Sequence, residues 1–280
     1  MIFGAHGQLG ASLLKGFAQA DPTTTLKTLS WKEVGHLNAP LLREKIAQTG
    51  ALEGPCDFIL ANGLTDPKIS PDLLMASNLR FPQMVAEAMQ GHPGCRFVTF
   101  GTIFENFPET CKTNPYMRSK LELSQWILSQ ANGDQRFIHF RLHTLYGGKI
   151  VRHLFLGQMI EAIRSNSEFK MTRGDQIREY HHVDDISFAA VQFLERPNPA
   201  TVTELNSGNP LTLHKIAKAV FAAFEKSPLL KVGAIESPAG ENIEKIFPAS
   251  EKSLLPKSRE PLPNIILWLQ NNLTSTNISG

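Results

Sequence analysis

The chain has 280 residues, of which 42% are hydrophobic and 19% charged, and its formal net charge at pH 7 is +2. This composition excludes a disordered or fibrous chain and predicts one large domain, or one with a small satellite. The charge is too small to indicate binding to nucleic acid or to an anionic membrane. No apolar run approaches the roughly 18 residues of a membrane span, and a glycine-rich turn comes too early for a signal peptide, so we expect a cytoplasmic protein.

The first half of the chain alternates short apolar runs with amphipathic segments. Strands are expected at 1–3, 24–29, 56–61, 95–100 and 137–148, and helices at 9–20, 39–50, 71–90 and from Pro115 onward. The runs DFILA and RFVTF are largely apolar rather than alternating, as expected of strands buried on both faces. Strands and helices in this order predict an α/β fold of the doubly wound Rossmann type, with a parallel sheet.

The second half has a different rhythm. We expect helices at 154–165 and 184–196, a short strand at 168–172, and a strand, turn and helix within 203–226, with Thr212 as the helix cap. From about residue 229 the chain is richer in proline and less periodic. We therefore predict a dinucleotide-binding domain at 1–148, completed by about 177–207, and a smaller, irregular substrate lobe at 149–176 and 208–280.

The sequence GAHGQLG at residues 4–10 lies between the first predicted strand and the first predicted helix. Gly4 permits a tight turn, Gly7 lets main-chain amides approach a pyrophosphate, and Gly10 lets the helix pack closely on the sheet. The alternative is an ordinary strand-to-helix turn. Its position at the first such junction favours dinucleotide binding.

The segment TLSWKE at residues 28–33 follows the second predicted strand, where a carboxylate marks NAD by binding the ribose 2′-hydroxyl. Ser30 and Lys32 stand there instead, and a hydroxyl with an ammonium suits a 2′-phosphate. NADP(H) is therefore favoured over NAD(H), although Glu33 leaves NAD open.

Tyr116 and Lys120 lie four residues apart at the start of a predicted helix, so their side chains share one helix face. A tyrosine with a pKa near ~10 needs a neighbouring cation to exchange protons at neutral pH, and Lys120 provides one. The alternative is a chance pair on a solvated face. The preceding buried strand ends at Thr99 to Thr102, and parallel sheets bind ligands beyond the carboxyl ends of their strands.

Together GAHGQLG, the strand end Gly101-Thr102, YMRSK and REYHHVDDI at 178–186 resemble the extended short-chain dehydrogenase/reductase family, also described as the NAD-dependent epimerase/dehydratase family. The resemblance covers nearly the whole chain. The segments FKMTRGDQIREYHHVDDIS and NSGNPLTLHKIAKAV are most similar to nucleotide-sugar 4-ketoreductases of the CDP-abequose and CDP-paratose synthase type.

The resemblance implies roles for individual residues. Tyr116 would be the general acid, Lys120 its electrostatic partner, and Thr102 the hydroxyl that polarises the carbonyl, with Thr99 as the fallback. Thr102 and Thr99 are chosen because Phe100 occupies the position where the family often has a hydroxyl. The implied cofactor-binding residues are Gly4, His6, Gly7, Gln8, Leu9, Gly10, Ser30, Lys32, Asn62, Gly63, Tyr116, Lys120 and Leu142.

The implied substrate-binding residues are Asn78, Thr102 and Arg178. A guanidinium suits bidentate binding of the substrate diphosphate, and the alternative for Arg178 is a salt bridge to Asp175 or Glu179. His181 and His182 are expected to be structural, ahead of a helix cap at Asp184 or Asp185. Cys56, Cys95 and Cys111 are widely spaced and indicate neither a disulfide framework nor a zinc site, so no metal is expected.

Three functions remain open at this point. The first is an NADPH-dependent reductase of a nucleoside-diphosphate 4-keto-deoxysugar. The second is an epimerase that retains NAD and returns the hydride to the same sugar, and the third is an inactive cofactor-binding sensor or scaffold. Dehydratases of this family carry an Asp-Glu pair after the catalytic threonine, whereas Ile103 and Phe104 follow here. The resemblance also suggests a homodimer formed through helices that include the tyrosine helix.

Overall fold

The computed structural model describes residues 1–66, 68–132, 134–196, 201–236, 255 and 259–274. The chain divides into two compact units. The first comprises Met1–Leu142 with Asp184–Leu205, and the second comprises His143–Val183 with Asn206–Gly280. The predicted division into a cofactor domain and a substrate lobe stays a prediction.

The first unit contains a parallel sheet of six strands in the order β10-β5-β4-β3-β1-β2. Its strands are β1 (Ile2–Phe3), β2 (Thr28–Leu29), β3 (Cys56–Leu60), β4 (Cys95–Thr102), β5 (Phe137–Leu142) and β10 (Val202–Leu205). The order reverses at β1, because β2 lies on one side of it and β3 on the other. This arrangement confirms the predicted Rossmann-type α/β fold.

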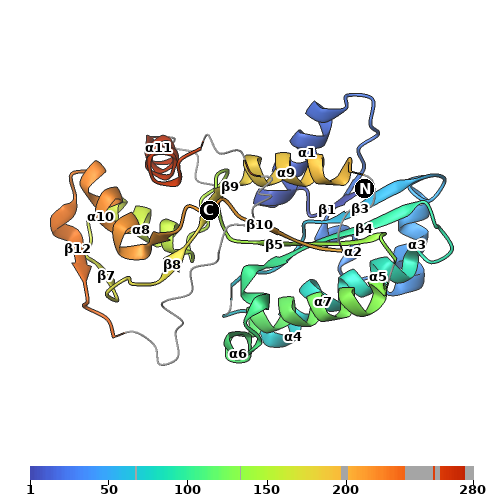
Figure 1. Cartoon of the computed structure of the whole chain (residues 1–280), viewed down its shortest axis with the longest axis horizontal. Helices are drawn as coiled ribbons and strands as arrows, with labels where there is room; N and C mark the ends of the chain where they lie inside the picture. The colour runs from blue at the N-terminus through green and yellow to red at the C-terminus, as the bar shows by residue number, and fades with distance from the viewer. Residues whose placement is uncertain (67, 133, 197–200, 237–254, 256–258, 275–280) are drawn as a thin grey trace. The chain divides into compact units, whose positions relative to one another are not determined.

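Helices cover both faces of this sheet (Figure 1). One face carries α1 (Gln8–Ala20) and α9 (Val183–Leu194), and the other carries α3 (Ala39–Ala47), α5 (Phe81–Ala88) and α7 (Pro115–Ala131). The shorter elements are α2 (Trp31–Val34), α4 (Pro71–Met75), η1 (Ala76–Arg80), η2 (Ile103–Asn106) and α6 (Pro108–Cys111). Over the described part of the chain, no helix is both long and apolar enough to cross a lipid bilayer.

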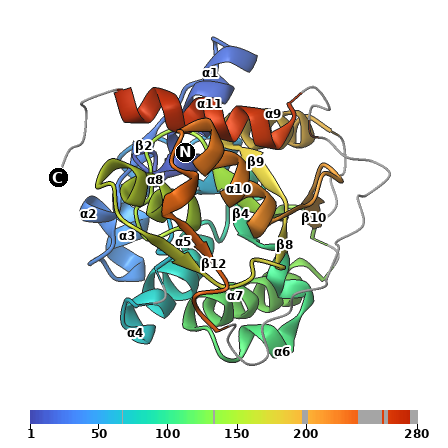
Figure 2. The same cartoon turned by 90° about the vertical axis from the view of Figure 1, so that its left-hand side faces the viewer.

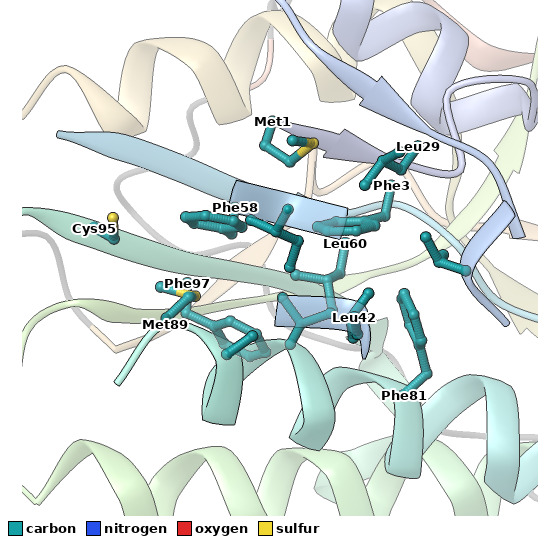
Figure 3. Close-up of a cluster of buried hydrophobic side chains, with 14 of the residues drawn as sticks. Met1, Phe3, Leu29, Leu42, Phe58, Leu60, Phe81, Met89, Cys95 and Phe97 are labelled. Atoms are coloured by element: carbon teal, nitrogen blue, oxygen red, sulfur yellow. The ribbon is translucent and has the colours of Figure 1, made fainter. Parts of the chain in front are cut away.

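A cluster of buried apolar side chains fills the space between the sheet and α3, α5 and α7 (Figure 3). Phe3 and Phe58 come from adjacent strands, and Phe81 of α5 meets Phe3 edge-on with ring centroids 5.5 Å apart. Leu42 of α3 is fully buried in the same cluster. Because strands with apolar residues on both faces need helices on both sides, this core fixes the layers that carry the site.

Over its described residues, the second unit contains short paired strands, three α-helices and a 3-10 helix. Its elements are β6 (Thr144–Tyr146), α8 (Phe155–Arg164), β7 (Phe169–Met171), β8 (Ile177–Arg178), β9 (Tyr180–His182), β11 (Leu211–Thr212), α10 (Leu213–Ala223), η3 (Ser227–Leu229), β12 (Leu230–Val232) and α11 (Pro261–Thr274). The pairs β6-β9 and β7-β12 are parallel, and β8-β11 is antiparallel. In Figure 2, α10 and α11 of this unit face the viewer, and both contribute to its apolar core.

Three predicted elements differ from the structure. The strand expected at 137–148 is broken at His143 into β5 and β6, which belong to different sheets. The helix expected at 71–90 contains a π-helical turn at Ala76–Arg80. The tail expected to be irregular contains α11, a helix of 14 residues. Thr212 does cap α10, because its hydroxyl accepts the main-chain N–H of Lys215.

Candidate active site

The glycine turn forms a close-packed cradle at the end of β1. Gly4 has a φ of +80°, a conformation that side-chain-bearing residues rarely adopt. A methyl group on Gly4 would lie 2.6 Å from the main-chain nitrogen of Asn62, and one on Gly10 would clash with the carbonyl group of Gly4. The backbone therefore needs glycine at both positions, for the reasons that the sequence predicted.

The N-terminus of α1 fits an anionic group. Gly7 is its N-cap, and within the described residues no side chain caps it and its first turn carries no acidic residue. Uncapped amides and the helix dipole favour a phosphate at such an end. Beside the cradle, Asn62 donates to the carbonyl of Ser77 at 3.3 Å, while its buried Oδ1 atom has no hydrogen-bond partner among the described residues. His6 is exposed at the turn, and Gln8 and Leu9 are half-buried.

At the end of β2, Ser30 caps α2 together with Glu33. The Glu33 carboxylate accepts both the hydroxyl and the amide of Ser30, each at 2.7 Å. These hydrogen bonds hold the pKa of Glu33 below its usual range. Lys32 is exposed beside them. The predicted 2′-phosphate residues thus lie at one strand end, with a carboxylate among them.

The helix α7 presents Tyr116 and Lys120 near its start. Asn114 caps the helix by accepting the amide of Met117 at 3.1 Å, and Pro115 occupies its first position, where no amide is needed. Tyr116 is half-buried, and Lys120 is only 7% exposed. The local sequence therefore starts the helix at the point that places this pair within its first two turns.

The Lys120 ammonium is anchored to β4. Its Nζ atom donates to the carbonyl oxygen of Phe100 at 2.9 Å. Burial lowers the pKa of Lys120 to about 8, opposed by the Glu105 carboxylate, which favours the charged form. Burial also raises the pKa of Tyr116, and Glu105 adds to that increase. The phenol is therefore held in its protonated form while the lysine remains mostly charged at neutral pH.

Asn78, on the π-helical turn, joins the segment after β3 to α7. Its amide donates to the carbonyl of Leu64 at 2.9 Å and to the hydroxyl of Ser119 at 3.0 Å, and its Oδ1 accepts the amide of Leu64. A methyl group on Gly63 would lie 3.1 Å from Asn78 Oδ1 and 3.4 Å from Lys120 Nζ. Gly63, Asn78 and Lys120, which are all predicted site residues, thus lie close together.

A buried polar network lies behind this pair, and the sequence analysis missed it. Glu105, three residues after Thr102, accepts the amide of Thr102 at 2.6 Å through Oε1. Its Oε2 lies 2.9 Å from Nε2 of His139 and 3.1 Å from Nε of Arg141. Two signals in the sequence point to it: the capping pattern T-x-x-E at 102–105, and polar residues at alternate positions of the apolar strand FIHFRL.

The Glu105 carboxylate is ionised within this network. Burial alone would raise its pKa, but His139, the Thr102 amide and Arg141 together outweigh that effect and lower it. The Nδ1 atom of His139 lies 2.7 Å from the Thr99 hydroxyl. Nε2 donates to the Glu105 carboxylate, which only accepts, and the Thr99 hydroxyl also donates to the Ile138 carbonyl at 3.4 Å.

Phe100 and Leu142 line the same strand ends with apolar surface. The Phe100 ring stacks on that of Phe140, with centroids 5.5 Å apart, and Leu142 pairs in register with Thr102. Thr102 is 7% exposed, and its hydroxyl oxygen accepts the amide of Phe104 at 3.4 Å. Phe100, at the position where the family resemblance led us to expect a hydroxyl, is therefore a stacked ring.

The second unit holds Arg178 and the histidines. Arg178, on β8, donates to the carbonyl of Ile177 at 2.8 Å. The proposed salt-bridge partners are engaged by other residues: Asp175 lies 3.1 Å from Arg173, and Glu179 lies 3.0 Å from His181. The pairing of His181 with Glu179 agrees with a structural role.

The predicted cap of α9 is wrong by two or three residues. The helix begins at Val183, so Asp184 and Asp185 lie in its first turn rather than at its cap. Asp184 instead accepts the hydroxyl of Ser12 on α1 at 2.7 Å. Acidic residues are common at helix caps, which explains the prediction, but a tertiary contact with α1 accounts for Asp184.

The parallel sheet, the uncapped glycine turn and the buried lysine beside the strand end define a dinucleotide-binding protein of the Rossmann type. The chain belongs to the NAD dependent epimerase/dehydratase family, whose model matches residues 1–207. The predicted family and the prediction of an NAD(P)-dependent enzyme are confirmed. No curated protein matches the sequence.

Solved structures of this architecture are similar over most of the chain. UDP-glucose 4-epimerase from Thermus thermophilus, in complex with NAD, has a TM-score of 0.77 at 15% identity, covering 98% of this chain and 99% of that one. The Thermotoga maritima UDP-glucose 4-epimerase with UDP-glucose has a TM-score of 0.78 at 15% identity, with 96% of each chain covered. A dTDP-4-dehydrorhamnose reductase from Bacillus anthracis, in complex with NADP, has a TM-score of 0.67 at 19% identity, covering 87% of this chain and 86% of that one. At these identities the likeness shows the fold.

Proposed function

We propose that the protein is an NAD(P)H-dependent reductase of a nucleoside-diphosphate 4-keto-deoxysugar. The observation that carries this proposal is the placement of Tyr116 and Lys120 on one face of α7, with the ammonium bound to the end of β4. Ligands of parallel sheets bind beyond the carboxyl ends of the strands. Burial and Glu105 raise the pKa of Tyr116, so the phenol holds its proton before the reaction, and donation requires the Lys120 cation beside the phenolate that forms.

The chemistry follows from the residues at the strand end. When bound, the reduced nicotinamide supplies the hydride. Tyr116 donates its phenolic proton to the carbonyl oxygen, and Lys120 stabilises the phenolate that remains. Thr102 is the hydroxyl that polarises the carbonyl, because the Thr99 hydroxyl is engaged by His139 at 2.7 Å. The Thr102 oxygen accepts an amide, which leaves its hydrogen to donate.

The residues present fit a dinucleotide. Gly4, Gly7 and Gly10 would hold the pyrophosphate at the start of α1, with Asn62 and Gly63 beside it. We favour NADP(H) over NAD(H) because Ser30 and Lys32 lie where the 2′-position is bound, although Glu33 shares this strand end. In the second unit, Arg178 would bind the substrate diphosphate.

An epimerase that retains NAD is the second candidate. The observation that favours it is the backbone fold, because the two UDP-glucose 4-epimerases have TM-scores of 0.77 and 0.78 against 0.67 for the reductase named above, although sequence identity is 15% for the epimerases and 19% for the reductase. Water elimination is disfavoured for either reading, because Ile103 and Phe104 follow Thr102 where a dehydratase places an Asp-Glu pair.

One experiment separates these functions. One portion of the purified protein is denatured to release and quantify bound nicotinamide. With a second, native portion, oxidation of NADPH and NADH is followed in the presence of nucleoside-diphosphate 4-keto-6-deoxysugars of different bases. Oxidation that depends on the keto sugar supports the reductase. Stoichiometric bound NAD, with interconversion of nucleotide hexoses and no oxidation of added NADPH, supports the epimerase. Cofactor binding without either reaction contradicts both and indicates a sensor or scaffold.

We further propose that two chains associate through the face that includes α7. Leu128 of α7 is 49% exposed and Leu73 of α4 is 44% exposed, so this side of the first unit presents apolar side chains to solvent. Light scattering coupled to size-exclusion chromatography measures the mass in solution. A monomer at micromolar concentration would contradict the proposal.

A further inference from the structure

The end of β4 is fixed by three bonds that reach it from other elements. The Thr99 side chain contacts Nδ1 of His139 on β5 at 2.7 Å. The Phe100 carbonyl accepts Lys120 Nζ of α7 at 2.9 Å, and the Thr102 amide donates to Glu105 of η2 at 2.6 Å. The Phe100 carbonyl, which anchors Lys120, thus lies between Thr99 and Thr102. Thr102 contacts the Glu105 carboxylate directly, and Thr99 is connected to the same carboxylate through His139.

Glu105 connects these contacts because its two carboxylate oxygens bind different partners. Oε1 accepts the Thr102 amide, and Oε2 meets both His139 and Arg141. The residue is only 3% exposed, so its charge is held by these partners rather than by water. Gly101 is required above it, since a methyl group there would clash with the carboxylate.

We propose that Glu105 is a positioning residue of the active site, which holds the Phe100 carbonyl where it fixes the Lys120 ammonium on the face of α7 that carries Tyr116. This inference rests on the proposed function, because it concerns how the catalytic pair is set. Neither the glycine turn nor the YxxxK pattern identifies it. The same carboxylate also favours the charged form of Lys120 against the cost of burial.

The elements packed on α7 carry other charged or titratable groups. They include Tyr116 of α7 itself, Cys111 of α6, Arg80 of η1 with its partner Asp72 of α4, His139 and Arg141 of β5, and Arg96 of β4 with its partner Asp57. Burial raises the pKa of Cys111 to about 11, so it stays neutral. Arg80 and Asp72 form an exposed pair, and Arg96 binds Asp57 at the start of β4. Glu105 is the carboxylate that acts on both members of the catalytic pair.

The test is a titration of Lys120 that needs neither cofactor nor substrate. Lysine labelled with ¹³C at Cε is incorporated, the Lys120 signal is assigned by its loss in Lys120→Arg, and its chemical shift is followed with pH. The expected wild-type midpoint is about 8. In Glu105→Gln, which keeps the shape and removes the charge, the midpoint should fall by about one pH unit. Glu109→Gln is the control, because this exposed carboxylate pairs with Lys112 on the surface.

A folded Glu105→Gln protein with the wild-type midpoint would overturn the proposal. If Glu105→Gln does not fold, Glu105→Asp decides, because it keeps the charge but withdraws it from the Thr102 amide. A fall of less than about one pH unit in the Lys120 midpoint of Glu105→Asp supports the proposal, and a midpoint equal to that of the wild type overturns it.

Turnover is then compared between the same proteins. We expect Glu105→Gln to lower kcat at neutral pH by about tenfold and to shift the alkaline limb of the pH profile downward, with KM for substrate little changed. Wild-type protein that titrates as expected but reduces no keto sugar contradicts the proposed function alone. Active wild-type protein whose Lys120 midpoint and pH profile ignore Glu105→Gln contradicts this inference alone.

Discussion

Lys120 reaches from α7 to donate a hydrogen bond to the carbonyl oxygen of Phe100, at 2.9 Å. A side chain on a helix and a carbonyl on a strand are thereby locked together, so the helix cannot slide without moving the strand end. Burying an ammonium costs free energy unless it is hydrogen-bonded, and burial lowers its pKa so that the neutral form is reached at a lower pH.

Replacing Tyr116 with phenylalanine should remove the proton donor while leaving the helix and the cofactor site intact. We expect turnover of the keto sugar to fall by about 10²- to 10⁴-fold, with the dissociation constant for NADPH little changed. Steady-state kinetics and cofactor titration measure the two effects. Tyr180→Phe is the matched control, since it removes the hydroxyl of a buried tyrosine in the other unit. Equal activity of Tyr116→Phe and wild type would refute the assignment.

Replacing Lys120 with methionine should abolish activity and change how stability depends on pH. The folded-state pKa of Lys120 is about 8, below the ordinary value of 10.5, so the native state loses its proton first as pH rises. Below pH 8 the wild-type protein is therefore destabilised by the full cost of burying the charged Lys120. As the pH rises from 8 to 10.5, this destabilisation disappears and the free energy of unfolding increases. The pH-dependent part of the difference between the two proteins should amount to about 3 kcal/mol.

Denaturant unfolding of both proteins at about pH 6.5, below the transition, and at about pH 10, near its upper end, checks this prediction. The advantage of the methionine variant should shrink at high pH. Losing the bond to Phe100 adds a penalty of about 1 to 3 kcal/mol that does not vary with pH. A difference in unfolding free energy that is constant across this range would show that Lys120 has the same pKa in the folded and unfolded protein, so that burial does not lower it.

Replacing Gly10 with alanine should damage the cofactor cradle, because the new methyl group would meet the carbonyl group of Gly4. We expect a loss of about 1 to 3 kcal/mol in stability and a weaker affinity for both NADPH and NADH. Thermal unfolding and fluorescence titration measure these effects. Gly54→Ala is the control, since no described atom lies within 4 Å of a methyl group there. Unaltered cofactor affinity in Gly10→Ala would mean that the turn does not hold the pyrophosphate.

Replacing Lys32 with alanine tests the choice of cofactor. If its ammonium meets the 2′-phosphate, affinity for NADPH should fall by about tenfold and affinity for NADH should stay the same. Glu33→Gln should act in the opposite sense, because it removes a negative charge from the same strand end. Lys170→Ala, on the surface of the other unit, controls for a general loss of positive charge. Equal losses for both cofactors in Lys32→Ala would indicate that the residue does not distinguish them.

Several features of the site were predictable because they depend on residues close in sequence. The turn at Gly4, Gly7 and Gly10 and the helix start at Asn114 are set by local backbone requirements, and the structure places them as expected. The parallel sheet followed from the alternation of apolar strands and helices. Tyr116 and Lys120 share a face because any two residues four apart on a helix do so.

Only the tertiary structure decided what surrounds that pair. Glu105 and His139 are 34 residues apart in the chain, and their contact exists because β5 pairs with β4 in one register. The same register lets Thr99 contact His139, which is why we propose Thr102 rather than Thr99 as the hydroxyl that polarises the carbonyl. Sequence patterns report which face of an element is apolar, but they do not report which polar groups meet inside the core. That pairing depends on strand order and register, which are set by the packing of the whole domain.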